Sequence, residues 1–275
     1  MSDIALSIRD LTIAIGDRKA PKPIVHGISL DLRAGRIQGL AGESGSGKTV
    51  SSLAVLGLLP ANAVVGGSMR LGETELIGLP LRRLRDIRGR RVAMIFQDPS
   101  SSLHPQLRIG AQLTDHVRRH LGYSKKKARA HAIELLERVQ VPGAVEALSR
   151  YPHQFSGGQR QRIAIAIALA CDPDVLLADE PTTALDVTVQ AGILQLLRDL
   201  ATERRLAVLL VTHDLGVMSA IADDVAVMRL GRIVEAGTRE QVFNAPEHEY
   251  TRELLAALPG AQGIGTVPSY AGEPI

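Results

Sequence analysis

The chain has few of the residues that mark secreted or nucleic-acid-binding proteins. Its 275 residues include one cysteine, Cys171, which excludes an internal disulfide and indicates a reducing compartment. Tryptophan is absent and aromatic residues make up only 3%, which leaves few platforms for stacking single-stranded bases. A formal net charge of +3 is too small to indicate an electrostatic partner of that kind. We therefore expect no nucleic-acid partner.

Long apolar runs are also missing. The longest uncharged apolar run near the Ser-Gly-Gly-Gln motif spans residues 163–171. It is about half as long as a bilayer requires. The N-terminus, Met1-Ser-Asp-Ile, lacks the basic and apolar regions of a signal peptide. We therefore expect no transmembrane span and a location in the cytoplasm. The hydrophobic content of 45% is sufficient for one large core or two modest ones.

A complete phosphate-binding loop is present. Residues 42–49 read Gly-Glu-Ser-Gly-Ser-Gly-Lys-Thr, a pattern in which glycines let successive backbone N–H groups curl around phosphates. Lys48 can reach the terminal phosphates, and Thr49 presents a hydroxyl to a magnesium ion that bridges phosphate oxygens. A chance match is expected in about 1% of chains of this length. The predicted phosphate-binding residues are Gly42, Glu43, Ser44, Gly45, Ser46, Gly47, Lys48 and Thr49.

The flanks of this loop support the interpretation. Residues 36–41 form an apolar run of strand type before it. After it, Leu53, Leu56 and Leu59 recur at helical spacing. The pattern therefore predicts a helix over residues 50–59, whose N-terminus would face the phosphates.

Three further apolar runs predict strands that each end in a polar residue. Residues 91–96 lead to Gln97, residues 174–180 end in Asp179 and Glu180, and residues 206–211 lead to His213. Parallel strands bring their carboxyl ends to one edge of a sheet, so these side chains are expected near the phosphate loop. An aspartate at this place suits magnesium, and a carboxylate one residue further on can deprotonate a water behind the terminal phosphate. An alternative for Asp-Glu-Pro-Thr-Thr is a helix N-cap before a proline-started turn.

The remaining periodicity completes the predicted fold. Residues 4–15 alternate like a strand that is interrupted at residues 9–10, which predicts an antiparallel edge layer. Residues 109–171 are helical in pattern, with Ser124 as a cap and a stop at Pro142-Gly143. One apolar face is expected from Ala128, Ala132, Leu135, Leu136 and Val139. We predict an α/β fold: a P-loop NTPase core with a mostly parallel sheet, an N-terminal antiparallel β layer and a helical subdomain inserted at about residues 98–171. Residues 1–257 would form one domain, followed by a tail at residues 258–275 that is rich in glycine and proline.

A second glycine motif, Phe155-Ser-Gly-Gly-Gln159, lacks an obvious ligand within one chain. Its hydroxyl and N–H groups open a predicted helix, and such groups can bind phosphate. Together with residues 42–49, Gln97, residues 175–180, Ala184-Leu-Asp186 and His213, in this order and spacing, it closely resembles the nucleotide-binding subunit of an ABC transporter. The resemblance covers nearly the whole chain.

The resemblance implies two such subunits packed head to tail, with each ATP between the phosphate loop of one and the signature residues of the other. Those signature residues are Ser156, Gly157, Gly158 and Gln159. It further assigns Gln97 to sensing the terminal phosphate and magnesium, Asp186 to the interface, His213 to the phosphate and attacking water, and Glu180 to the general base. The implied cofactors are ATP and Mg²⁺, with Thr49, Gln97 and Asp179 at the metal. ATP would close the dimer and hydrolysis would reopen it.

Within the family the chain looks most like the ATPases of peptide and nickel importers, on the stretches 23–30, 96–103, 179–187 and 243–252. The implied partners are a second, non-identical ABC ATPase subunit, two membrane permease subunits and, indirectly, an extracytoplasmic substrate-binding protein. The implied location is the cytoplasmic face of the plasma or inner membrane, as a peripheral subunit. Cargo is not specified by these residues.

Two departures and two alternatives accompany this interpretation. Phe155 stands where the family signature commonly starts with leucine, and residues 13–15, Ile-Ala-Ile, stand where relatives usually offer an aromatic ring for adenine. We therefore expect modest base selectivity. One alternative function is an ABC ATPase that is not coupled to transport, for example in iron–sulfur cluster assembly. The other is a phosphotransferase using the phosphate loop alone, which would leave residues 156–159 and Asp186 without a function.

Overall fold

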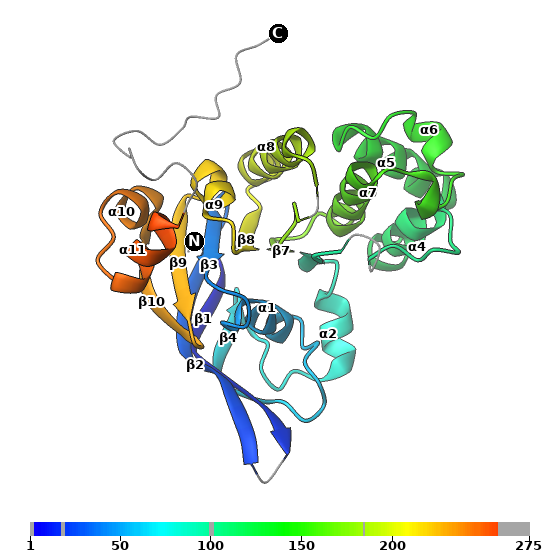
Figure 1. Cartoon of the computed structure of the whole chain (residues 1–275). Coiled ribbons are helices and arrows are strands. Elements are labelled where there is room, and N and C mark those ends of the chain that lie inside the picture. Colours follow the sequence, from blue (N-terminus) through cyan, green and yellow to red (C-terminus); the bar gives the residue numbers. More distant parts are fainter. Residues whose placement is uncertain (1–2, 18–19, 99–101, 184, 258–275) are drawn as a thin grey trace.

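The described residues form two β-sheets with accompanying helices, and a separate group of helices lies beside them (Figure 1). The structure is a computed structural model that describes residues 3–17, 20–98, 102–183 and 185–257. The predicted tail at 258–275 and Ala184 of the stretch Ala184-Leu-Asp186 lie outside the described residues, as do residues 99–101 at the start of the predicted helical subdomain. In the described ranges no helix is long and apolar enough to cross a membrane.

A six-stranded sheet forms the centre of the molecule. Its strands in spatial order are β10 (Arg232–Thr238), β9 (Asp224–Arg229), β3 (Ile37–Ala41), β8 (Ala207–Thr212), β7 (Val175–Asp179) and β6 (Val92–Ile95). All neighbours are parallel except β10, which pairs antiparallel with β9. Strands β7 and β8 are buried on both faces, as their apolar runs indicate, and β3 is buried except at the half-buried Gln38. The predicted strands before Gln97, Glu180 and His213 are thus confirmed, and their carboxyl ends share one edge.

A four-stranded antiparallel sheet packs against this core. Its order is β2 (Ala20–Arg33), β1 (Ile4–Asp17), β4 (Val64–Leu71) and β5 (Thr74–Glu75). The predicted edge layer is confirmed, and the predicted interruption is a register shift between Ile8 and Leu11, with Asp10 at a φ of 48°. Buried residues of β1 share one apolar cluster with Leu177 and Leu209 of the central sheet.

Six helices accompany the sheets in the described ranges: α1 (Lys48–Val55), α2 (Leu81–Ile87), α8 (Val187–Arg204), α9 (Leu215–Ile221), α10 (Arg239–Asn244) and α11 (Glu249–Ala256). Helix α1 ends before the predicted residue 59. Gly57 takes a φ of 59°, and the N–H of Leu58 returns to the carbonyl of Leu53. A left-handed glycine terminates a helix in this way, so the leucine spacing continues past the helix itself.

The helical group lies beside the sheets (Figure 1). It contains α4 (Ile109–Leu121), α5 (Lys125–Arg138), α6 (Ala144–Ala147), the 3-10 turn Pro152–Gln154 and α7 (Gly157–Leu169). Ser124 caps α5 as predicted by accepting the N–H of Lys127, and α5 ends ahead of Pro142. The five residues of its predicted apolar face are all buried. They belong to one cluster that continues into the central sheet, so the helical group is joined to the core by apolar packing.

Candidate nucleotide-binding site

The phosphate loop connects buried strand β3 to helix α1, and its glycines are required by close packing. Gly42 has a φ of 145°, and a Cβ atom at this position would lie 2.1 Å from the carbonyl oxygen of Met228. Gly47 caps α1 with a φ of 106°. Side chains rarely adopt such backbone conformations, so the loop keeps this shape only with glycine at both positions.

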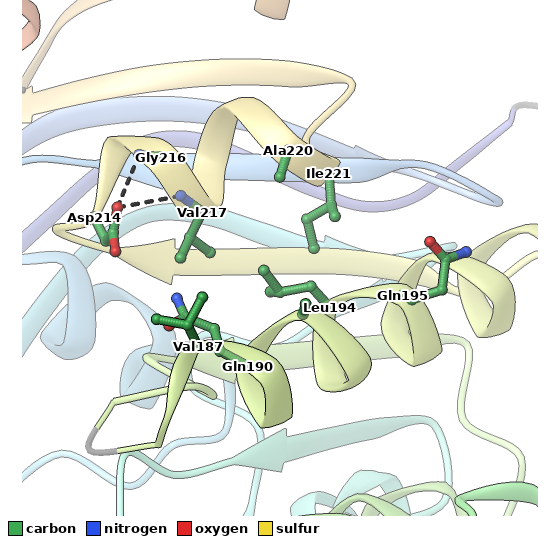
Figure 2. A pocket seen from close by; sticks show the side chains of 10 residues that line it. Val187, Gln190, Leu194, Gln195, Asp214, Gly216, Val217, Ala220 and Ile221 are labelled. Atoms are coloured by element: carbon green, nitrogen blue, oxygen red, sulfur yellow. Dashed lines mark hydrogen bonds between the residues drawn. The ribbon is translucent and has the colours of Figure 1, made fainter. Parts of the chain in front are cut away.

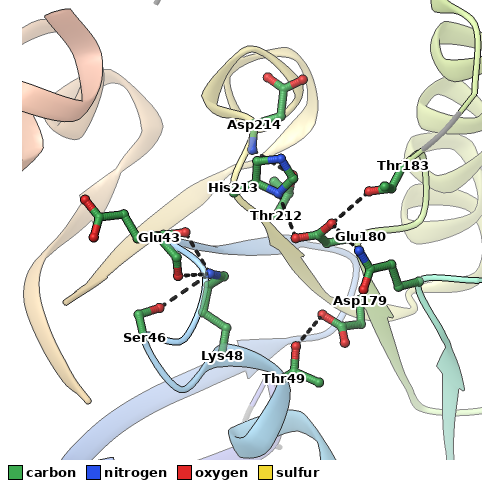
Figure 3. Close-up of polar contacts among 12 residues, drawn as sticks. Glu43, Ser46, Lys48, Thr49, Asp179, Glu180, Thr183, Thr212, His213 and Asp214 are labelled. Carbon is green, nitrogen blue, oxygen red and sulfur yellow. Dashed lines mark hydrogen bonds and ion pairs between the residues drawn. The ribbon is translucent and has the colours of Figure 1, made fainter. Parts of the chain in front are cut away.

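Lys48 is buried beneath the loop. It is 6% exposed, and its Nζ donates to the carbonyl oxygens of Gly42 and Glu43, each at 2.7 Å (Figure 3). Burial lowers the pKa of Lys48, and the carboxylates of Glu180, Asp179 and Glu43 act in the opposite direction. A phosphate beside Nζ would also favour the ammonium form.

Asp179 and Thr49 face each other across the start of α1. The hydroxyl of Thr49 donates to Oδ1 of Asp179 at 3.1 Å. Burial raises the pKa of Asp179, and the hydrogen bond from Thr49 opposes that change. Hydroxyl and carboxylate oxygens are the ligands that Mg²⁺ prefers, so the donor set fits that ion. The amide oxygen of Gln97 is a third oxygen atom that could serve as a ligand of Mg²⁺.

Glu180 is the centre of a polar network just past the end of β7 (Figure 3). Nδ1 of His213 lies 2.7 Å from its Oε1, while Nε2 of Gln97 and the hydroxyl of Thr183 donate to Oε2 at 3.0 and 2.8 Å. Burial by itself would raise the pKa of Glu180, but the hydrogen bonds from His213 and Thr183 hold this pKa below its ordinary value. The hydrogen bonds therefore favour the carboxylate form, which is the form that can accept a proton.

The backbone of Glu180 has an unusual conformation. Its φ is 47°, which is uncommon for a residue other than glycine, and its N–H bonds to the carbonyl of Val211 on β8. The alternative N-cap interpretation of Asp179 and Glu180 is wrong, because Asp179 is the last residue of β7 and the cap of the next helix is Asp186.

Sequence reasoning missed Thr183 at this site. It stands three residues after Glu180, in the Asp-Glu-Pro-Thr-Thr stretch that was interpreted only through its two acids. Its position in the same turn is the signal that identifies it as a possible partner. It also missed Tyr250, whose hydroxyl accepts the N–H of Glu43 at 3.2 Å. No local signal links Tyr250 to Glu43, since 207 positions separate them in the sequence.

The signature residues lie elsewhere, on the helical group. Ser156 caps α7: its Oγ accepts the N–H of Gln159 at 3.3 Å, and the side chain of Gln159 accepts the N–H of Ser156 at 3.1 Å. Asp186 similarly caps α8 by accepting the N–H of Val189 at 2.9 Å. A Cβ on Gly158 would lie 2.6 Å from Cγ1 of Val189. The structure thus joins Gln97, Glu180 and His213 by hydrogen bonds. In contrast, Ser156 of the signature and Asp186 are the N-caps of α7 and α8.

A hollow of about 270 Å³ lies between α8 and α9 (Figure 2). Its walls include Val187, Leu194, Val217 and Ile221. At one end Asp214, the residue after His213, caps α9. The residues that line this hollow include none from the phosphate loop, so we do not assign the nucleotide to it.

Comparison with known proteins places this geometry in a family. The family model described as ABC transporter matches residues 25–183. The dipeptide transport ATP-binding protein DppD of Bacillus subtilis is 45% identical over 92% of this chain and 76% of its own length. The oligopeptide transport ATP-binding protein OppD of Haemophilus influenzae is 45% identical over 94% of this chain and 80% of its own.

Solved structures agree with the sequence relatives. A dimeric ATP-binding cassette in a post-hydrolysis state, bound to ADP and Pi, matches with a TM-score of 0.75 at 26% identity, over 85% of this chain and 98% of that one. A protein from Clostridium perfringens, cbiO1, part of the ABC transporter complex cbiONQ, has the same fold, with a TM-score of 0.75 at 24% identity over 94% of this chain and 97% of that one. The chain therefore belongs to the ABC transporter family and is an ATP-binding cassette that hydrolyses ATP.

Proposed function

We propose that this chain is the ATP-hydrolysing subunit of a peptide importer. The observation that carries the proposal is the 45% identity over more than nine tenths of the chain to proteins named for dipeptide and oligopeptide transport. Because these relatives are named for peptides, peptide cargo is favoured over nickel or its chelates, the other cargo that the sequence resemblance suggested.

In this proposal the loop at residues 42–49 wraps the phosphates, and Lys48 leaves the carbonyls of Gly42 and Glu43 to meet the terminal phosphates. Thr49, Asp179 and Gln97 would hold Mg²⁺, which neutralises charge on the phosphate oxygens when it is bound. Glu180 takes the proton from the attacking water. His213 orients that water, with its Nδ1 fixed at 2.7 Å from Oε1 of Glu180.

The second subunit would complete the site. Ser156, Gly157, Gly158 and Gln159 would contact the ATP held by a non-identical ATPase, and Asp186 would lie at the shared interface. The N–H groups at the start of the 13-residue helix α7 favour an anion at that end. A dimeric cassette among the structural neighbours supports this arrangement.

The remaining assignments follow from coupling to transport. Residues 1–257 would act as one ABC ATPase domain, within which the helical subdomain at about 98–171 transmits closure to two membrane permease subunits. An extracytoplasmic binding protein would deliver the peptide, and the chain would sit peripherally at the cytoplasmic face of the membrane. Nucleic acid is not a partner in this proposal.

Uptake in cells tests the cargo. Cells whose own copy carries Glu180→Gln would be given a labelled tripeptide and, separately, radioactive nickel. We expect peptide uptake to fall to background while nickel uptake continues. Glu137→Gln, an exposed glutamate on α5, is the matched control and should leave both unchanged. Loss of nickel uptake with normal peptide uptake would contradict the proposed cargo.

An ABC ATPase outside transport, for example in iron–sulfur cluster assembly, is the competing function. It predicts that neither uptake changes in the Glu180→Gln cells and that the subunit does not copurify with permeases from solubilised membranes. Reduced activity of iron–sulfur enzymes in those cells would favour it.

A further inference from the structure

The stretch 243–252 carries part of the resemblance to peptide and nickel importer ATPases, but it supplies none of the proposed catalytic or metal-binding residues. The structure brings it to the phosphate loop. Tyr250 of α11 is 2% exposed, and its hydroxyl oxygen accepts the N–H of Glu43 at 3.2 Å. Glu43 is the second residue of the loop, and its carbonyl oxygen accepts the ammonium of Lys48 at 2.7 Å. The backbone of Glu43 is therefore held on one side by Tyr250 and on the other by Lys48.

Tyr250 is itself fixed from strand β10. The two carboxylate oxygens of Glu235 accept the N–H groups of Glu247 at 2.8 Å and His248 at 3.1 Å. Nδ1 of His248 then accepts the N–H of Tyr250 at 3.1 Å, which caps α11. This chain of contacts sets where α11 begins, and thereby where the phenol ring points.

A second contact holds the loop from the same side. The guanidinium carbon of Arg229, at the end of β9, lies 4.5 Å from the centre of the Tyr250 ring. Two residues later the N–H of Gly231 donates to the carbonyl of Ser46 at 3.0 Å. The loop is thus fastened at Glu43 and at Ser46, on either side of the exposed residues Ser44 and Gly45.

We propose that Tyr250 is a positioning residue for ATP binding, whose buried hydroxyl fixes the backbone of Glu43 so that the loop N–H groups and Lys48 are preorganised for the triphosphate. Phosphate binding by a loop depends on the direction of its N–H groups, and ordering them in advance reduces what binding must supply. This inference rests on the nucleotide site and not on the cargo, so it survives if the proposed peptide function fails.

Tyr250→Phe in the full chain tests it directly, because phenylalanine keeps the ring beneath Arg229 and removes only the hydroxyl. Calorimetric titration with ATP and Mg²⁺ should give a Kd about tenfold higher, as expected when the loop N–H of Glu43 loses its partner and the loop its fixed geometry. Turnover at saturating ATP should stay within twofold. Tyr123→Phe, which removes a phenol in the helical group where the ring contacts Lys127, is the control and should leave Kd unchanged.

A Kd within threefold of the wild type overturns the proposal, even if the melting temperature falls, since that result would mean that the hydroxyl only stabilises the fold. Glu235→Ala provides a second test that does not alter Tyr250, and it carries the test alone if Tyr250→Phe does not fold. We expect a Kd about fivefold higher, and no further increase when it is combined with Tyr250→Phe, because both act on one contact. A Glu235→Ala Kd within twofold of the wild type, or independent effects that multiply, would contradict the route through Tyr250.

Discussion

The phosphate-loop region and the signature region of this molecule satisfy their polar groups in opposite ways. Around the phosphate loop the side chains bond across elements: Thr49 of α1 to Asp179 of β7, and His213 after β8 to Glu180 after β7. In the signature region Ser156 and Gln159 bond to each other within one turn of α7. The side chains of the first region are therefore connected to one another by hydrogen bonds between elements. The second region is a helix N-terminus whose partner is a separate molecule in our proposal.

The difference has a structural cause. The residues of the first region follow four neighbouring parallel strands, β3, β8, β7 and β6, so sheet pairing alone brings them together. The signature lies on the helical group, which is joined to the sheet by apolar packing rather than by strand pairing. We therefore expect nucleotide binding to depend on the first region and turnover to depend on both.

Replacing Glu180, the proposed base, should produce the largest effect. Glu180→Gln keeps the size of the side chain and removes the proton acceptor, so turnover of ATP should fall by about 100-fold or more. ATP should still bind, and size-exclusion chromatography in ATP and Mg²⁺ should show a trapped dimer, provided that the partner ATPase is present. Glu137→Gln serves as the control. An active Glu180→Gln enzyme would show that another group is the base.

Ser156→Ala separates binding from turnover. Loss of the signature hydroxyl should reduce turnover by about 30-fold, which is less than loss of a full oxyanion-hole donor costs, because the neighbouring backbone N–H groups remain. The Kd for ATP of the isolated chain should stay within twofold. Ser124→Ala is the matched control, because Ser124 caps α5 through a hydrogen bond of the same 3.3 Å length. Both variants should lose about 1 kcal/mol of stability, measured by urea unfolding. Equal turnover in the two variants would mean that Ser156 is only a cap.

Thr183→Val should have a smaller effect that depends on pH. The hydroxyl of Thr183 helps to hold the pKa of Glu180 below its ordinary value, so its removal raises that pKa. Since the proposed base, Glu180, can accept a proton only when deprotonated, the acidic limb of the turnover profile should move to higher pH. Turnover at alkaline pH should fall by about threefold at most.

The control for this variant is Thr202→Val on α8, where the hydroxyl donates to the carbonyl of Arg198. It should leave the whole pH profile unchanged. An acidic limb that stays in place in Thr183→Val, or that moves to lower pH, would show that the hydroxyl does not influence the ionisation of Glu180.

The parts of the nucleotide site were not equally predictable from the sequence. The strands before Gln97, Glu180 and His213 are continuous apolar runs, so their burial and shared edge could be deduced. The local sequence Asp-Glu-Pro-Thr-Thr was ambiguous between a strand end and a helix cap, and pairing of β7 with β6 and β8 decides it. The contact from Tyr250 depends on how α11 packs after β10, which no periodicity encodes. The predicted end of α1 at residue 59 was wrong, because the helix ends before Gly57 whereas the leucine spacing continues beyond it.

The preference for one base over another should show the smallest effect. It tests a part of the nucleotide site that phosphate contacts do not cover. Ile13 is buried in the apolar cluster of the antiparallel sheet, and Ile15 packs against the same cluster; neither offers an aromatic ring. The sequence has no phenylalanine, tyrosine or tryptophan before Phe96. Apolar contact with a base face does not distinguish adenine from guanine, because every base has such a face. Competition binding should therefore show ATP and GTP within about fivefold of each other, and a strong preference for ATP would mean that a polar group reads the adenine edge.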